Sequence, residues 1–96
     1  MDISVQELQD RLNSGQTPHL IDVREPDEYA ADNIGGRLIP LGELHYRLDE
    51  LDGLRAEEVI VHCRSGKRSA MARQILEENG FANVRNLTGG MLAYRA

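Results

Sequence analysis

The chain has 96 residues and a formal net charge of −5, with 41% hydrophobic and 28% charged residues. A chain of this length buries roughly 60 to 65% of its unfolded surface around one core, which predicts one domain over residues 1–96 and excludes a two-domain enzyme. The acidic balance disfavours nonspecific nucleic-acid binding, because such binding depends on neutralising phosphates, and the composition argues against disorder.

Cysteine usage and hydropathy restrict the class of protein further. No apolar stretch approaches 18 residues and residues 1–4 lead into polar sequence, so we expect a cytoplasmic protein that does not engage a membrane. Cys63 is the only cysteine, which excludes an intrachain disulfide and a multi-cysteine metal site and favours a reducing compartment. His19 and His45 lack metal-ligand spacing, and we predict no metal and no cofactor.

In the N-terminal half, the sequence predicts a first helix and then two strands that alternate with further helices. Ser4 and Glu7 form a capping-box pattern at the start of an amphipathic helix that stops at Asn13. Residues 19–23 are short and apolar enough for a buried strand. After this strand come a short helix at 25–29, a turn at 33–36, a brief strand at 37–39 and one helix face made by Leu41, Leu44, Leu48 and Leu51.

The C-terminal half continues the alternation of strands and helices. Residues 59–62 give the strongest strand signal, because three consecutive positions are β-branched. A helix is predicted over 69–79 with Gly80 as its cap, followed by a strand at 84–87 and a short terminal helix. This order predicts an α/β fold with a central parallel sheet of about four to five strands and helices on both faces.

Cys63 directly follows the strand at 59–62, where ligands bind in open parallel sheets. A lone cysteine at the end of an apolar strand is usually a small core residue. Here, however, four of the 11 basic residues and no acidic residue lie between positions 59 and 76. Ser65 and Gly66 permit a tight loop whose N–H groups turn inward and bind an anion. Because such surroundings lower a thiol pKa, we interpret Cys63 as an activated nucleophile.

The neighbours of Cys63 each allow a functional and a structural role. Arg64 and Lys67 attract and orient an oxyanion donor, or they are two solvated side chains on an exposed turn. Arg68 binds the donor, or it locks the loop by pairing with a carboxylate. His62 is predicted to point to the face of the strand opposite Cys63 and to pack there.

Three motifs in order along the chain resemble the rhodanese family of sulfurtransferases. Residues 20–29 are similar to its first signature, 63–69 to its active-site loop and 87–94 to its closing signature. Asn33 and Tyr94 depart from the family pattern, in which His and Trp are common at these positions. The resemblance covers essentially the whole chain and implies a single rhodanese-like domain.

The resemblance implies a thiosulfate sulfurtransferase that works through a persulfide. The Cys63 thiolate attacks a donor such as thiosulfate, sulfite leaves, and cyanide or a thiol then removes the sulfur. A thioredoxin-like protein or a sulfur-carrier protein is a candidate acceptor, since residues 33–41 are similar to rhodanese domains fused to enzymes that charge sulfur carriers. Asp22 and Arg24 are placed beside the loop, where Asp22 accepts loop hydrogen bonds or both residues make ordinary caps and pairs. The residues assigned to the substrate-binding loop are Arg64, Ser65, Gly66, Lys67, Arg68 and Ser69.

Two other functions remain open from the residues alone. A cysteine phosphatase or arsenate reductase also has a His-Cys pair and an Arg-Ser pair around its loop. Those phosphatases place five residues between Cys and Arg, whereas four lie between Cys63 and Arg68, and the shorter loop suits one sulfur atom better than a phosphoryl group. The other alternative is a noncatalytic rhodanese-like module for protein binding or sulfur relay, a class marked by loss of the cysteine that this chain retains.

Overall fold

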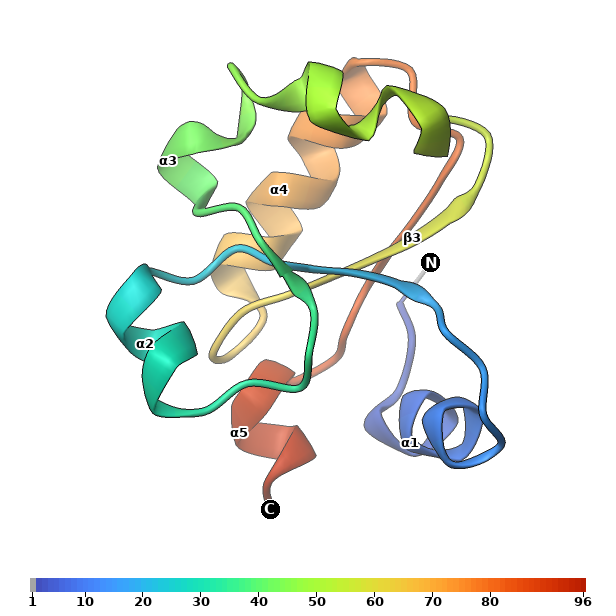
Figure 1. Cartoon of the computed structure of the whole chain (residues 1–96), viewed down its shortest axis with the longest axis vertical. Coiled ribbons are helices and arrows are strands. Elements are labelled where there is room, and N and C mark those ends of the chain that lie inside the picture. Colours follow the sequence, from blue (N-terminus) through green and yellow to red (C-terminus); the bar gives the residue numbers. More distant parts are fainter. Residues whose placement is uncertain (1) are drawn as a thin grey trace.

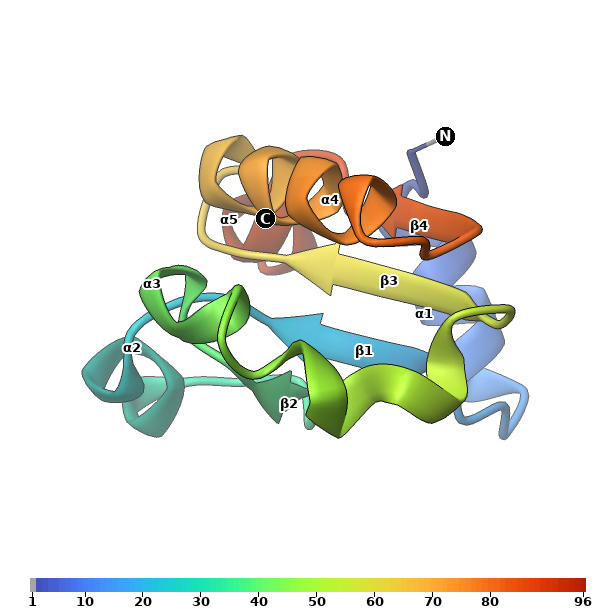
Figure 2. The same cartoon turned by 90° about the horizontal axis from the view of Figure 1, so that it is seen from above.

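The computed structural model describes residues 2–96 (Figure 1) and contains one sheet of four parallel strands in the order β2-β1-β3-β4 (Figure 2). This arrangement confirms the predicted α/β fold. The strands are β1 (His19–Asp22), β2 (Arg37–Leu38), β3 (Glu58–His62) and β4 (Asn83–Asn86). The helices are α1 (Val5–Asn13), α2 (Pro26–Ala31), α3 (Leu41–Leu44), the 3₁₀ helix η1 (Leu48–Leu54), α4 (Lys67–Glu78) and α5 (Gly90–Tyr94).

Helices cover both faces of the sheet, as Figures 1 and 2 show. One face packs against α3, η1 and α4, and its buried residues include Val59, Val61 and Leu76. The other face packs against α1 and α5, and its buried residues include Leu8 and Ile60. Since successive residues of a strand point to opposite faces, β3 contributes to both cores, which explains its nearly continuous apolar sequence.

Local sequence signals account for where α1 and α4 begin. The Ser4 hydroxyl accepts a hydrogen bond of 3.0 Å from the Glu7 amide, which confirms Ser4 as the N-cap. The Glu7 side chain accepts hydrogen bonds from Arg85 instead of completing the predicted capping box. The α4 helix begins at Lys67, two residues before the predicted start, because Gly66 adopts a left-handed φ of +108° and turns the chain directly into the helix.

The prediction that residues 41–51 form one continuous helix face was wrong. The structure contains two short helices, α3 and η1, with residues 45–47 between them. Leu48, Leu51 and Leu54 recur every three residues, so they line one side of a 3₁₀ helix, whose period is three. The predicted burial is nevertheless present: Leu44 and Leu51 are fully buried, and Leu48 packs against the same core.

The carboxyl ends of β1 and β3 lie at one edge of the sheet, beside α2, α5 and the start of α4 (Figure 1). The parallel pairing aligns Asp22 with His62 in the last position of each strand. The residues that follow these two strands are therefore neighbours. Within residues 2–96, none of the helices combines the length and the apolar character needed to cross a bilayer.

Candidate active site around Cys63

Cys63 lies at this edge of the sheet, directly after β3, and is only 1% exposed. The turn that follows directs backbone N–H groups toward its sulfur. The N···Sγ distances are 3.1 Å from Gly66 and 3.4 Å from Ser69. Both donors come from the loop and the first turn of α4, where backbone N–H groups have no partner inside the helix. The loop therefore presents converging donors to one atom.

The environment of Cys63 has opposing effects on its thiol. Burial acts to raise the pKa of Cys63, because it removes the charged thiolate from water. Hydrogen bonding by the N–H groups of Ser69, Gly66 and Ser65 acts in the other direction, and the pKa of Cys63 is lowered overall. A lowered pKa increases the fraction of thiolate, which is the nucleophilic form.

Helix α5 forms hydrogen bonds to the backbone at the start of the loop. The amides of Met91 and Leu92 donate hydrogen bonds of 2.9 and 3.0 Å to the carbonyls of Cys63 and Arg64. Gly90 allows this close approach, since a Cβ at position 90 would lie 2.5 Å from the Cys63 carbonyl oxygen and 2.7 Å from that of Arg64. The paired glycines of the closing motif therefore bring α5 against the backbone that carries Cys63.

Arg68 pairs with Glu28 rather than standing free at the loop. Its two terminal nitrogens donate hydrogen bonds of 2.7 and 2.9 Å to the Glu28 carboxylate. The hydrogen bonds from Arg68, together with one from the backbone of Glu25, lower the pKa of Glu28 to about 2. Of the two roles considered for Arg68, the contacts thus match the one in which it locks the loop.

Asp22 and Arg24 form a buried ion pair at the carboxyl end of β1. The carboxylate accepts three hydrogen bonds of 2.7 to 3.1 Å from the Arg24 guanidinium and a fourth from the Arg24 backbone amide. Arg24 also donates to the carbonyl of Asp32 at 2.7 Å. The expected hydrogen bonds from the loop to Asp22 are not formed, because Arg24 occupies both carboxylate oxygens. Nor is the pair on the surface, since Asp22 is 0% and Arg24 5% exposed.

His62 is fully buried, and neither of its ring nitrogens has a hydrogen-bond partner. Its Nε2 lies 3.8 Å from Oδ2 of Asp22. Burial lowers the pKa of His62, although the nearby Asp22 charge acts to raise it. The neutral ring is therefore favoured in the folded protein, in keeping with the predicted packing role.

Arg64 and Lys67 differ from the other basic residues of the chain. Both are exposed, and no carboxylate of residues 2–96 lies within ion-pair distance of either. The other nine of the 11 basic residues all form ion pairs: Arg11, Arg24, Arg37, Arg47, Arg55, Arg68, Arg73, Arg85 and Arg95. The uncompensated positive charge of an acidic protein is thus concentrated in the loop after Cys63.

Asn86 is a site residue that the sequence analysis missed. It ends β4 with 9% exposure, and its amide contacts two residues of the loop. Its Oδ1 accepts a 2.6 Å hydrogen bond from the Ser69 hydroxyl, and its Nδ2 donates to the Gly66 carbonyl at 3.2 Å. A polar residue two positions after Val84, on the same inward face of the strand, was the available signal.

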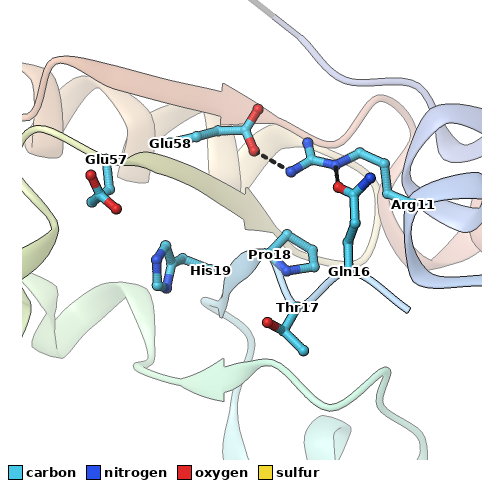
Figure 3. A pocket seen from close by; sticks show the side chains of 7 residues that line it. All are labelled: Arg11, Gln16, Thr17, Pro18, His19, Glu57 and Glu58. Carbon is cyan, nitrogen blue, oxygen red and sulfur yellow. Dashed lines mark hydrogen bonds and ion pairs between the residues drawn. The ribbon is translucent and has the colours of Figure 1, made fainter. Parts of the chain in front are cut away.

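Two hollows differ in their relation to this site. A groove of about 480 Å³ lies between α2 and α5, with Arg64, Met91 and Leu92 in its lining. A smaller pocket of about 240 Å³ lies at the opposite, amino-terminal end of the strands, where Arg11 pairs with Glu58 at 2.6 Å (Figure 3). Only the first hollow adjoins the Cys63 loop. Residues 2–96 contain no group of three or more side chains arranged to hold a metal ion.

Comparisons with known proteins agree with this geometry. The chain is 36% identical over 91 residues to the Bacillus subtilis protein named "Putative sulfur carrier protein YrkF", covering 94% of this chain but only 48% of YrkF. It is 36% identical over 72 residues to thiosulfate sulfurtransferase PspE of Escherichia coli, covering 74% of this chain and 69% of PspE. The human single-domain sulfurtransferase TSTD1 superposes with a TM-score of 0.83 at 30% identity, covering 98% of this chain and 94% of TSTD1. The family model of the rhodanese-like domain matches residues 4–96, and the chain belongs to the rhodanese-like domain family.

Proposed function

We propose that this chain is a sulfurtransferase that carries a sulfane sulfur on Cys63 and accepts it from thiosulfate or a similar anionic donor. The observation that carries the proposal is the loop after Cys63, whose N–H groups converge on Sγ while Arg64 and Lys67 stand without carboxylate partners. The names of the relatives PspE and TSTD1 support the same activity.

In the first half of the reaction the Cys63 thiolate attacks the outer sulfur of thiosulfate. A bond forms between Sγ and that sulfur, and the bond between the two thiosulfate sulfurs breaks with its electron pair leaving on sulfite. Sulfite is a stable anion, so its departure requires no proton donor. This chemistry is compatible with a site whose nearest donors to Sγ are backbone amides of the loop.

In the second half the outer sulfur of the persulfide is attacked by cyanide or a thiolate, and the Cys63 thiolate is regenerated. The terminal persulfide sulfur is anionic and is stabilised by N–H donors that converge on it, as in other anion sites. The groove beside Arg64 gives an acceptor a route to the loop. Candidate acceptors include small thiols, a thioredoxin-like protein and a sulfur-carrier protein. A cytoplasmic setting belongs to this proposal, because a lone thiol suits a reducing compartment.

Intact-mass spectrometry with and without thiosulfate tests the proposal directly. We expect the mass to rise by about 32 Da, the mass of one covalently held sulfur, and to return to its starting value with cyanide or dithiothreitol. The Cys63→Ser variant should show neither change. A donor-dependent sulfur transfer that persists in Cys63→Ser would contradict the proposal.

An aryl phosphate assay on the same protein tests the phosphatase alternative. The four-residue spacing between Cys63 and Arg68 offers a narrower cradle than a phosphoryl group needs, so hydrolysis should not be detected. Hydrolysis at rates that match sulfur transfer, and that is lost in Cys63→Ser, would favour the phosphatase instead. A protein with neither activity would fit the noncatalytic module.

A further inference from the structure

The orientation of the Asn86 amide is determined by the Gly66 carbonyl. A carbonyl oxygen only accepts hydrogen bonds, so the Asn86 atom that lies 3.2 Å from it must be the nitrogen. The same carbonyl also accepts the Ala70 amide at 3.1 Å as α4 begins. The Asn86 oxygen consequently faces the Ser69 hydroxyl, at 2.6 Å.

This orientation commits the single proton of the Ser69 hydroxyl. Because Oδ1 of Asn86 has no proton to donate, the short hydrogen bond between the two residues requires the proton of Ser69. The Ser69 oxygen then presents lone pairs to Sγ of Cys63, 3.4 Å away. Lone pairs favour a protonated thiol, which donates to them, over a thiolate, which cannot.

We propose that Asn86 is a positioning residue that holds the Ser69 proton away from the sulfur and so favours the thiol form of Cys63 in the resting protein. The proposal rests on the proposed role of Cys63 as the nucleophile. When the Cys63 proton leaves to water, the Ser69 hydroxyl turns toward the thiolate and its hydrogen bond to Asn86 breaks. The N–H groups of Gly66 and Ser69 face the sulfur in both states.

The charged groups near Cys63 take no part in the hydrogen bonds that join Asn86, Ser69 and Cys63. Arg68 of α4 interacts electrostatically with the sulfur and is itself paired with Glu28. Helix α5 contributes no charged residue between Gly90 and Tyr94. The neighbouring segments also carry Arg64 and Lys67 of the loop and the Asp22–Arg24 pair at the end of β1. On α4, Arg73 pairs with Glu77 and Asp2, and on β4, Arg85 pairs with Glu7 and Glu58. Removing the Asn86 amide changes none of these charges.

The test is a pH titration of the thiolate by its ultraviolet absorbance, from which the titration of Cys63→Ser is subtracted to remove the signal of the three tyrosines and leave that of the single thiol. Asn86→Leu, similar in shape, and Asn86→Ala both free the Ser69 proton for the thiolate. We expect each to lower the pKa of Cys63 by about half a unit to one unit, the effect of one hydrogen bond. Asn83→Ala, at the exposed start of the same strand, is the matched control and should leave the titration unchanged.

A purely structural role for Asn86 predicts the opposite direction. If the amide only braces the loop, its loss loosens the N–H donors around the sulfur and raises the pKa of Cys63. The variant Ser69→Ala separates the two roles, because in that background Asn86→Ala should no longer lower the pKa. An unchanged or raised pKa, an equal decrease without the Ser69 hydroxyl, or loss of the fold in both Asn86 variants would overturn the proposal. Since this titration needs no sulfur donor, its failure is distinct from failure to form a persulfide.

Discussion

The carboxylate of Glu28 holds the guanidinium of Arg68 by two hydrogen bonds of 2.7 and 2.9 Å, although the residues are 40 positions apart in the sequence. Glu28 belongs to the short helix α2 and Arg68 to the first turn of α4. The pair therefore connects the segment after β1 to the end of the Cys63 loop. Its geometry is bidentate, the arrangement in which an arginine–carboxylate pair is most specific.

Replacing Glu28 should show how much the Glu28–Arg68 ion pair contributes to stability and how that contribution depends on pH. We expect Glu28→Gln to lower the free energy of unfolding by about 1 kcal/mol at neutral pH, since the pair is partly exposed and screened. The folded pKa of Glu28, about 2, lies below its ordinary value of 4.5, so the stabilisation is complete above pH 4.5 and is lost as the pH falls toward 2. Denaturant unfolding of both proteins across this range measures it.

The exposed Glu57 has no ion-pair partner among residues 2–96 and provides the matched control. Glu57→Gln should change stability little at any pH in this range. If the difference in unfolding free energy between the wild type and Glu28→Gln stays constant from neutral pH down to pH 2, the ion pair does not supply the stabilisation.

The unpaired charges of Arg64 and Lys67 lead to a kinetic prediction. Substitution of either by Ala should raise the KM for thiosulfate by about threefold to tenfold, because each cation attracts the dianionic donor to the loop. Added salt should produce a similar increase in the wild type. Steady-state rates with varied thiosulfate measure the effect, while the step with cyanide should change less.

Arg37→Ala is the control for a general change in net charge, since Arg37 is exposed on β2 and pairs with Glu50. Its KM for thiosulfate should equal that of the wild type. Unchanged kinetics in the Arg64→Ala, Lys67→Ala double variant at low salt would assign both side chains to the solvated surface.

The close contact between Gly90 and the backbone of Cys63 and Arg64 leads to a prediction on packing. The Cβ of Gly90→Ala would overlap two carbonyl oxygens that cannot move without displacing the loop, and φ at Gly90 is +57°. We expect a loss of about 2 to 4 kcal/mol in unfolding free energy together with slower persulfide formation. Thermal unfolding and intact-mass kinetics on the same samples test both effects.

Gly42→Ala in α3 is the corresponding control, because a Cβ there meets nothing within 4 Å. It should leave persulfide formation unaffected and keep or slightly raise stability. Full stability and full activity in Gly90→Ala would show that α5 does not constrain the loop.

The position of the Cys63 loop could be predicted from the sequence, because its signals are local. The apolar run of β3, the Ser65-Gly66 turn and the basic residues that follow are consecutive, and parallel sheets bind ligands at that edge. The contacts of Arg68 with Glu28 could not be predicted, since many carboxylates were candidates and only the tertiary fold selects one. For Asn86 the strand was predicted, but its hydrogen bonds to the loop depend on the pairing of β3 with β4.

The buried His62 yields a prediction for the range just below neutral pH. Its folded pKa lies below the ordinary value of 6.5, chiefly because of burial, so below pH 6.5 the unfolded chain takes up a proton that the folded chain resists. The stability should therefore fall as the pH drops from about 6.5, with a slope of up to about 1.4 kcal/mol per pH unit, the limit for one proton. Above pH 7 the pH dependence of stability that His62 causes should vanish.

The variant His62→Leu removes the titrating group while it keeps the position apolar. Because neither ring nitrogen has a hydrogen-bond partner, the substitution leaves no donor or acceptor unpaired and should cost little at pH 7.5. At pH 5 it should be more stable than the wild type, so the two stability curves cross. His45→Leu, which removes an exposed histidine, should retain the wild-type slope between pH 7 and 5. Since this range lies above the ordinary pKa values of the carboxyl groups, a wild-type slope that persists in His62→Leu would show that burial of this ring does not govern stability here.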